Sequence, residues 1–441
     1  MIELLSQNVL HVLQLLLGFT YYYPLFMAYL WTIGALWFYF RYEYRKPKNI
    51  QLPVNPKVSI VVPCFNEEDH VREVIGHLMD MNYPNYEVLA VNDGSTDNTG
   101  ATLDEMALHH PRLRVIHLAK NQGKSVALNT AAYLADSDYI IGIDGDALLD
   151  HDAIPLFVQH FLSEPRVGAV TGNPRIRTRS TLLGRLQVGE FSSLVGLIKR
   201  AQRVFYRQLF TASGVITAFR QSALKDVDFW SQDMLTEDMD ITWKLQLRGW
   251  DVRFEPRALA WILMPETMNG LWNQRLRWAM GGLQIIGKYK GMFRDWRSYP
   301  VWPLFFEHIL SVLWACSVTV VLAAYCIDVM AYMYQIITSV SEASSASITS
   351  STSVNSMTSL LPEYSGVIIG TTCLLQMLVS LLLDCRYDHQ LMRYYIWTIW
   401  YPFGFWLVNM LTIIVAIPKT LLRKRGLRAR WVSPDRGVTH L

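Results

Sequence analysis

Acidic residues follow two apolar runs of the sequence, with spacings that suit ligand binding. Asp93 precedes Gly94 at the end of one run, and Asp144 and Asp146 flank Gly145 after another. Open α/β sheets bind their ligands at the carboxyl ends of the strands. Asp93 suits a hydrogen bond to a ribose hydroxyl or a uracil imide, and the Asp144–Asp146 pair suits a hard divalent cation that also takes diphosphate oxygens and water. Both groups are equally typical of ordinary turns.

A third acidic group, Glu237, Asp238 and Asp240, follows Thr236 and opens a predicted helix. Acids in a first turn are favoured by the helix dipole, so such a group is often only a cap. A partly buried carboxylate with a raised pKa also suits a general base that takes a proton from a hydroxyl group.

Gln274, Arg277 and Trp278 share one face of a predicted helix because they stand at positions i, i+3 and i+4. Together they offer an amide, a guanidinium that neutralises phosphate charge, and an aromatic plate on which a sugar ring stacks. Arg275 lies one position off this face, and we expect it to matter less. The alternative is an amphipathic helix that anchors the domain at a membrane surface.

Smaller groups follow two predicted strands. Pro63, Asn66 and Glu67 come after the first strand, and Lys124 follows Gly123 after the third. The Lys124 ammonium suits contact with phosphate as a point charge.

Apolar runs alternate with helical segments between residues 56 and 265, which predicts repeated β-α units and a largely parallel, Rossmann-like sheet. The expected strands are Val58–Pro63, Tyr86–Asn92, Leu113–Leu118, Asp138–Asp144 and Val167–Thr171. The expected helices are Asp69–Asp80, Asp97–His109, Lys124–Ala135 and Asp152–Phe161.

The composition indicates a membrane protein. Of 441 residues, 51% are hydrophobic and 17% are charged, which argues against a wholly soluble or disordered chain. A net charge of +3 gives no reason to expect nucleic-acid binding, and the five cysteines form no disulfide framework or zinc spacing. Residues 1–41 form an N-terminal membrane segment of one or two helices, about Asn8–Tyr21 and Leu25–Phe40. Arg41, Arg45, Lys46 and Lys48 then place the following domain in the cytoplasm.

The C-terminal third has three expected parts. Residues 266–300 are amphipathic, 301–418 hold apolar segments near Trp302–Ile327, Gly366–Leu383 and Tyr395–Ile417, and 419–441 form a basic tail. A Ser-rich loop, 339–359, separates the first two apolar segments. Three crossings would place the basic tail opposite the catalytic domain, so either one segment does not cross or Trp302–Val340 crosses twice.

Taken in order, the Asp93 turn, the Asp144–Asp146 pair, the Glu237–Asp238 pair and the Gln274–Trp278 group resemble the signature of processive family 2 glycosyltransferases, which include cellulose, chitin and hyaluronan synthases. Further stretches resemble the bacterial synthases of poly-β-1,6-N-acetylglucosamine, a biofilm exopolysaccharide. These stretches are Gly172–Ser180, Pro265–Thr267 and Arg430–Gly437.

The resemblance implies a GT-A (Rossmann-like) domain, inserted between transmembrane helices, that polymerises N-acetylglucosamine from UDP-N-acetylglucosamine with inversion. Asp238 would be the general base, and Asp146 would bind Mg²⁺ or Mn²⁺. The implied donor-binding residues are Pro63, Asn66, Glu67, Asp93, Lys124, Asp144 and Arg277, and the implied acceptor-binding residues are Glu237, Gln274 and Trp278.

The resemblance also implies a multi-pass protein of the bacterial inner membrane that helps to move the growing chain across it. A small two-span membrane partner and activation by cyclic di-GMP together with that partner belong to the same expectation.

Other functions remain open on the residues alone. One is another processive synthase, of chitin, hyaluronan or cellulose type, and another is a non-processive enzyme that moves one sugar to a lipid phosphate. A transporter or receptor with a nucleotide-binding domain usually has polar residues inside its spans, and Glu307, His308 and Asp328 are the obvious candidates here.

Overall fold

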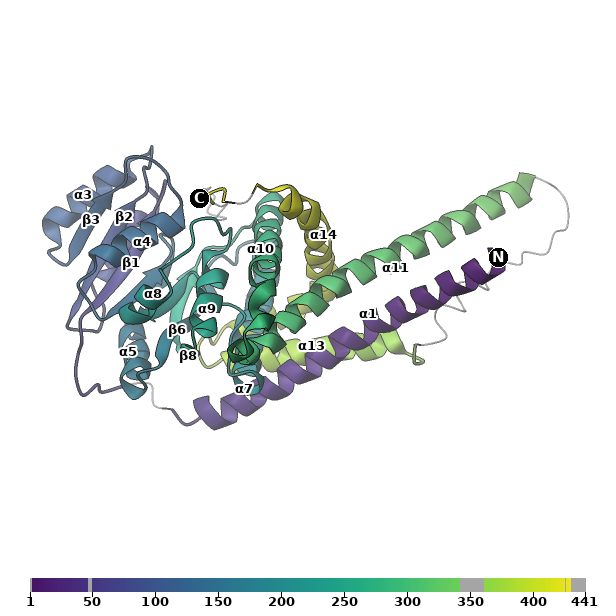
Figure 1. Cartoon of the computed structure of the whole chain (residues 1–441), viewed down its shortest axis with the longest axis horizontal. Helices are drawn as coiled ribbons and strands as arrows, with labels where there is room; N and C mark the ends of the chain where they lie inside the picture. The colour runs from purple at the N-terminus through teal and green to yellow at the C-terminus, as the bar shows by residue number, and fades with distance from the viewer. Residues whose placement is uncertain (1, 47–49, 342–360, 425, 430–441) are drawn as a thin grey trace.

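The computed structural model describes residues 2–46, 50–341, 361–424 and 426–429 (Figure 1). It has an α/β domain at one end and long helices that project from that domain on the other side (Figure 1). Most of the Ser-rich loop expected at 339–359, and the Arg430–Gly437 stretch, lie outside the described residues.

Four parallel strands form the first half of the sheet, in the order β3-β2-β1-β4. Their bounds are β1 Val58–Cys64, β2 Tyr86–Asn92, β3 Leu113–His117 and β4 Tyr139–Ile143. The helices between them are α2 Val71–Leu78, α3 Thr99–His109 and α4 Lys124–Leu134, and α5 Ala153–Ser163 follows the short strand β5 Leu148–Leu149. The predicted elements of this half are therefore confirmed to within two or three residues.

The second half of the sheet is mixed, which corrects the prediction of a largely parallel sheet. Strand β7 (Ile216–Arg220) runs antiparallel to both β4 and β6 (Val167–Ile176), while β6 pairs in parallel with β8 (Asp251–Ile262). A long helical excursion precedes β7, formed by α6 Leu182–Phe191, a π-helical turn Ser192–Leu197 and α7 Ile198–Phe205. Strand β7 enters the sheet from the opposite end after this excursion, and no simple β-α repeat predicts that.

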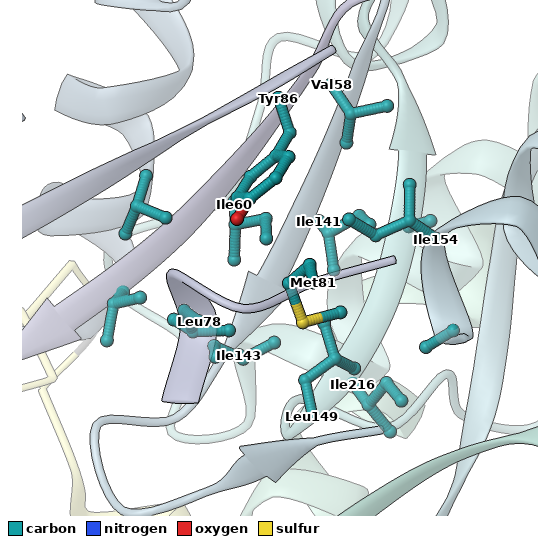
Figure 2. Packing of buried hydrophobic residues seen from close by; sticks show 14 of the residues in the cluster. Val58, Ile60, Leu78, Met81, Tyr86, Ile141, Ile143, Leu149, Ile154 and Ile216 are labelled. Atoms are coloured by element: carbon teal, nitrogen blue, oxygen red, sulfur yellow. The ribbon is translucent and has the colours of Figure 1, made fainter. Parts of the chain in front are cut away.

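Alternate residues of each strand point to opposite sides of the sheet, and helices cover the apolar side chains on both faces. Val58, Ile60 and Val62 pack with α2, α3 and α5 on one face, and Figure 2 shows part of this core around Leu78, Met81 and Ile141. Val61 and Leu89 pack on the other face with α4, α8 (Gln221–Asp226) and α9 (Glu237–Leu247). Burial on both faces explains why these strands read as continuous apolar runs.

The N-terminal segment is one helix, α1 (Ile2–Phe38), and not two. Pro24 lies inside it without ending it. Among the described residues, three helices are long and apolar enough to cross a membrane: the stretches Asn8–Glu43 and Trp296–Thr338, and α13 (Ser365–Asp384). The second stretch includes α11 (Trp302–Ser341), a single continuous helix, so the region does not cross twice.

The last helix, α14 (Tyr401–Leu422), has a shorter apolar stretch, Trp406–Leu422, and runs beside α10 (Met268–Tyr289) (Figure 1). The chain then returns to the α/β domain, where Arg428 Nη1 donates to Gln122 Oε1 over 2.9 Å and the Ala429 amide donates to the Gln232 carbonyl over 3.0 Å. The described end of the tail, Arg428 and Ala429, therefore contacts the catalytic domain. Of the two explanations of the crossing conflict, a segment that does not cross agrees with these contacts.

Three further stretches are 3-10 helices, at Lys290–Arg294, Trp296–Val301 and Leu391–Trp400.

A buried ion cluster joins the projecting helices to the α/β domain. Arg200 of α7 binds Glu43, at the end of the N-terminal segment, over 2.8 Å and Asp384, at the end of α13, over 2.9 Å. Arg175 of β6 binds the other oxygen of Asp384 over 2.6 Å, and the Tyr387 hydroxyl donates to Glu43 over 2.6 Å. Removing one member of such a cluster leaves a buried charge unpaired, so the cluster fixes the N-terminal segment and the end of α13 against α7 and β6.

Candidate active site

A cavity of about 740 Å³ lies between the carboxyl ends of the central strands, helices α7 and α10, the last part of α1 and the first part of α11. This volume is in the range of cavities that enclose small-molecule ligands. The structure brings the predicted residues of four sequence regions to its wall: Lys124, Asp144, Asp146, Glu237, Asp238, Gln274, Arg277 and Trp278.

Lys124, the first residue of α4, lies at the centre of the acidic side of the cavity. Its ammonium group is 2.5 Å from Asp144 Oδ1 and 3.0 Å from Glu237 Oε1, and it donates to the Gly214 carbonyl over 3.1 Å. Burial alone would lower the pKa of Lys124, but the charges of Asp144 and Glu237 outweigh burial and raise it. Lys124 therefore stays protonated and offsets the charge of the surrounding carboxylates.

Asp238 is held at the start of α9 by backbone donors. Its Oδ1 accepts from the Met239 amide over 2.9 Å and its Oδ2 from the Gly214 amide over 3.2 Å. Burial and the neighbouring Glu237 charge raise the pKa of Asp238 to about 6, against the lowering effect of Lys124. For Glu237 burial acts upward as well, but the charges of Lys124 and Arg277 prevail and lower its pKa. Of the two neighbouring acids, Asp238 is the stronger base and suits proton abstraction near neutral pH.

Asp146 is buried at 9% exposure and follows β4 on the same wall as Asp144. No group of three or more His, Cys, Asp or Glu side chains that could hold a metal by itself occurs among the described residues. Because Lys124 already pairs with Asp144, the donor set fits a cation that takes one carboxylate from the protein and its other oxygens from a bound anion. Magnesium sites at substrate phosphates commonly have this form.

Asp93 and the residues after β1 lie outside the lining of this cavity. Asp93 is fully buried, and its two oxygens accept from the amides of Gln122 and Gly123 over 2.9 and 2.8 Å. It thereby shapes the turn that leads into Lys124, and Gly94 (φ 66°) lets the backbone pass within contact of Lys120 there.

Of the other predicted donor residues, Pro63 and Glu67 flank Gly145. A Cβ atom at Gly145 would meet the Pro63 carbonyl oxygen at 3.0 Å and Glu67 Cγ at 3.3 Å. Asn66 has a left-handed backbone (φ 54°), and its side-chain oxygen accepts from the Thr96 amide over 2.9 Å. Pro63 and Glu67 therefore lie beside the Asp144–Asp146 turn. Contact of Pro63, Asn66 and Glu67 with a sugar-nucleotide donor stays a prediction.

Helix α10 forms the opposite wall of the cavity and presents Gln274, Arg277 and Trp278 to it, as their spacing predicts. The helix packs so closely on the start of α9 that a Cβ atom at Gly281 would lie 2.1 Å from Thr236 Oγ1. The Arg277 charge lowers the pKa of Glu237, which places its guanidinium near the acidic side. The Gln274 side-chain oxygen is buried and has no hydrogen-bond partner among the described residues.

Arg275 corrects the expectation drawn from its position on the helical wheel. It is only 3% exposed, binds buried Glu190 of α6 over 2.8 Å, and its guanidinium lies 4.3 Å from the ring centre of Trp278. Burial raises the pKa of Glu190 to about 7, although the Arg275 charge acts against this. Arg275 therefore packs against the Trp278 ring, and we expect substitutions at this buried position to affect the site.

We expect Arg275→Lys to reduce polymer yield about tenfold, as much as Arg277→Lys, because lysine keeps the charge but not the planar group that stacks on Trp278 and grips a carboxylate. The two variants should differ in kinetics. Loss of Arg275 should raise KM for an acceptor oligosaccharide, whereas loss of Arg277 should lower kcat. Arg294→Lys, an exposed position just beyond α10, is the matched control. Wild-type kinetics in Arg275→Lys would show that Trp278 needs no such support.

Several residues of this site carry no signal in the sequence. Gly214 contributes only backbone atoms, which contact both Lys124 and Asp238. Lys199 of α7 lines the cavity 3.4 Å from Thr171 Oγ1, and burial lowers the pKa of its ammonium to about 7 although Asp238 raises it. Trp31 and Ser311 reach the cavity from helices that read only as membrane spans. No pattern within α7, α1 or α11 points to them.

Comparisons with known proteins agree with this geometry. Residues 59–228 match the model of glycosyl transferase family 2. A poly-beta-1,6-N-acetyl-D-glucosamine synthase of Staphylococcus aureus (strain MSSA476) is 36% identical over 426 residues, which cover 96% of this chain and 98% of that relative. The synthase of the same name from Staphylococcus epidermidis is 35% identical over 95% of this chain and 98% of its own length.

Among solved structures, the mannosyltransferase PcManGT from Pyrobaculum calidifontis, in complex with GDP-Man and Mn²⁺, has a TM-score of 0.57 at 19% identity and covers 94% of this chain and 100% of its own. This similarity supports the GT-A-like fold that the sheet order shows. The high coverage and identity of the staphylococcal relatives show more than the fold. The chain is a glycosyltransferase and belongs to the family of the poly-β-1,6-N-acetyl-D-glucosamine synthases, with a family 2 glycosyltransferase domain.

Proposed function

We propose that this chain is a processive, inverting synthase that polymerises N-acetylglucosamine from UDP-N-acetylglucosamine into a β-1,6-linked exopolysaccharide of the biofilm matrix and guides the chain across the membrane. The observation that carries the proposal is the continuity of one cavity. Its wall runs from Asp144 and Asp238 to Trp31 of α1 and Ser311 of α11. A site that only transferred one sugar to a small acceptor would not need the second end. The names of the staphylococcal relatives supply the sugar and the linkage.

The chemistry assigned to the residues is a single displacement. Asp238 takes the proton of the acceptor 6-hydroxyl. The oxygen of that hydroxyl bonds to the anomeric carbon of the donor as the bond from this carbon to the diphosphate breaks. An α-linked donor thereby gives a β-linked product, and UDP leaves with the electron pair. The positive charges of Lys124 and Arg277 lie on the cavity wall where the diphosphate charge develops.

The remaining predicted residues bind and orient. Trp278 offers its ring to the terminal acceptor sugar, with Gln274 and Glu237 as polar contacts. Asp93 and the group Pro63, Asn66 and Glu67 border the nucleotide end through the turns that they hold. Sugar rings bind well to such walls because an aromatic face and hydrogen-bonding groups stand side by side.

A divalent cation, Mg²⁺ or Mn²⁺, is part of the proposal. PcManGT was solved with Mn²⁺, and the buried carboxylate of Asp146 fits one protein ligand of such an ion. When bound, the cation would neutralise charge on the diphosphate leaving group.

We also propose that the protein is a multi-pass protein of the bacterial inner membrane, with the catalytic domain and the basic tail in the cytoplasm. Arg41, Arg45 and Lys46 follow the first span, and the tail contacts the catalytic domain on the same side. The family resemblance adds a small two-span partner and activation by cyclic di-GMP together with that partner. Nucleic acid is not an expected ligand.

The test is synthesis by the purified protein in detergent or lipid nanodiscs, with labelled UDP-N-acetylglucosamine. We expect label in a high-molecular-weight product that a β-1,6-specific hexosaminidase degrades and a cellulase does not. A single labelled sugar on lipid phosphate would instead identify a non-processive enzyme, and binding of UDP-sugar without turnover would identify a transporter or receptor.

A further inference from the structure

Helix α10 has a stripe of residues that begins in the active site and continues beyond it. Its members are Arg277, Gly281, Gln284 and Lys288, which are separated by four, three and four residues. Such spacings return to nearly the same angle around an α-helix, so the four residues lie in one row along its surface. Lys288 ends the row about 16 Å from Arg277 along the helix axis.

The row packs on residues 235–240, the segment that leads into α9 and carries the proposed base. At Gly281 the two backbones are so close that a Cβ atom would lie 2.1 Å from Thr236 Oγ1. One turn further, Gln284 Oε1 accepts from the Leu235 amide over 3.0 Å. The two opposite walls of the cavity are therefore joined to each other outside it, at a fixed register.

Asp240 is the last point of this junction, and it is a buried acid that the proposed reaction does not use. It is 0% exposed, and it follows Asp238 by two residues, which places it on the other side of α9, away from the cavity. Its Oδ1 accepts from Lys288 Nζ over 2.6 Å and from the Tyr289 hydroxyl over 2.8 Å. Hydrogen bonds of this kind, from a cation to a carboxylate, are among the strong ones in proteins.

The two donors supply the hydrogen bonds that a buried carboxylate needs. Burial and the Asp240 charge raise the pKa of Tyr289, so its hydroxyl keeps the proton that it donates. Among the described residues, Asp240 Oδ2 is buried and has no hydrogen-bond partner, so this carboxylate depends on the end of α10. Separating Lys288 from Asp240 would leave a buried charge poorly compensated, which is costly.

The motion that these contacts oppose is a rotation of α10 about its own axis. A rotation of about 20° moves a group about 6 Å from the axis by about 2 Å. Misplacement of a reacting or stabilising group by only about 1 Å can lower a rate by about a hundredfold. Because Arg277 lies on the same row, the contacts of Gln284 and Lys288 fix the angle at which its guanidinium enters the cavity.

We propose that Gln284, Lys288 and Asp240 are positioning residues for the transfer reaction. Through the rotation of α10 they hold Arg277 in register with Asp238 on the opposite wall. The three residues lie outside the lining of the cavity, so they act through Arg277 and not on a substrate. This inference rests on the proposed function, because it takes the Arg277 guanidinium to act on the diphosphate.

The test is a double-mutant cycle between Lys288 and Arg277, measured as UDP release by the purified full-length protein. Lys288→Met removes the ammonium group and keeps most of the length of the side chain. We expect kcat to fall about tenfold and KM for UDP-N-acetylglucosamine to stay within about twofold, as for loss of a group that acts in the transition state. In an Arg277→Lys background the same change should lower kcat by less than about twofold.

This lack of additivity separates positioning from a general loss of stability. Side chains more than about 10 Å apart with no shared partner normally have additive effects, and Lys288 and Arg277 are about 16 Å apart along the helix. Lys288→Arg keeps a cation and should restore kcat to within about threefold of wild type. Lys290→Met repeats the substitution at an exposed position off the row and should keep wild-type kinetics.

A second pair of variants carries the same test if Lys288→Met does not fold. Gln284→Leu removes the oxygen that accepts from the Leu235 amide, whereas Gln284→Glu keeps an oxygen at that place. The leucine variant should lose about tenfold in kcat, and this loss should again vanish in the Arg277→Lys background. The glutamate variant should stay within about threefold of wild type.

Failure of this inference can be told apart from failure of the proposed function. Losses at Lys288 or Gln284 that multiply with the loss at Arg277, or unchanged kcat in Lys288→Met and Gln284→Leu, would overturn the positioning role alone. Wild-type kcat in Arg277→Lys would remove Arg277 from the proposed reaction and this inference with it. A wild-type protein that makes no N-acetylglucosamine polymer would refute the proposed function itself.

Discussion

Replacing Asp238 with Asn is expected to lower polymer synthesis by about 10²–10⁴, the usual range for loss of a general base. Asn keeps the size of the side chain, and its single oxygen can still accept from one of the two amides, Gly214 or Met239, that hold Asp238 in place. The donor site should bind UDP-N-acetylglucosamine as before. Calorimetric titration with UDP should give a dissociation constant within about threefold of wild type, which is a difference of less than about 1 kcal/mol in binding free energy.

The pH dependence gives the same assignment a second test. Burial and the Glu237 charge raise the pKa of Asp238 to about 6, so the base is ionised above that pH and protonated below it. The rate should fall as the pH falls through about 6, and the residual rate of Asp238→Asn should lack this acid limb. Asp233→Asn, at an exposed acid in the loop before α9, should behave as wild type. Near-normal polymer yield in Asp238→Asn would remove Asp238 from the catalytic role.

Removal of divalent cations should stop synthesis, and Mg²⁺ or Mn²⁺ should restore it. In Asp146→Ala we expect a loss of at least about a hundredfold that added metal does not restore, since charge stabilisation by a cation contributes several kcal/mol to the transition state. The Asp146 carboxylate is buried in the wall of the same cavity as Asp144 and Glu237.

Two comparisons make the metal experiment decisive. Asp136→Ala, at an exposed acid after α4, should keep both its activity and its response to metal. Binding of Mn²⁺ in the presence of UDP, followed by electron paramagnetic resonance, should be lost in Asp146→Ala alone. Activity that persists in chelator would mean that Lys124 and the arginines neutralise the diphosphate without a cation.

The sequence determined the elements and most of the chemical groups. Strands β1, β2 and β4 are buried on both faces, so their apolar runs are continuous and their ends are sharp. Acids directly after such strands fall at one edge of the sheet by the geometry of parallel pairing, which is why Asp144 and Asp146 could be placed in advance. Helical spacing likewise placed Gln274, Arg277 and Trp278 on one wall.

Only the tertiary structure decided how those groups are paired and what completes the cavity. Helical spacing suggested that Arg275 was a neutral position, but the approach of α6 brings Glu190 to it and makes it the support of Trp278. The antiparallel entry of β7 brings the Gly214 backbone between Lys124 and Asp238. Trp31 of α1 and Glu307 of α11 line the same cavity although they come from helices far apart in the sequence. Local patterns record periodicity and turn chemistry, whereas these contacts join residues of different elements and depend on how whole elements pack.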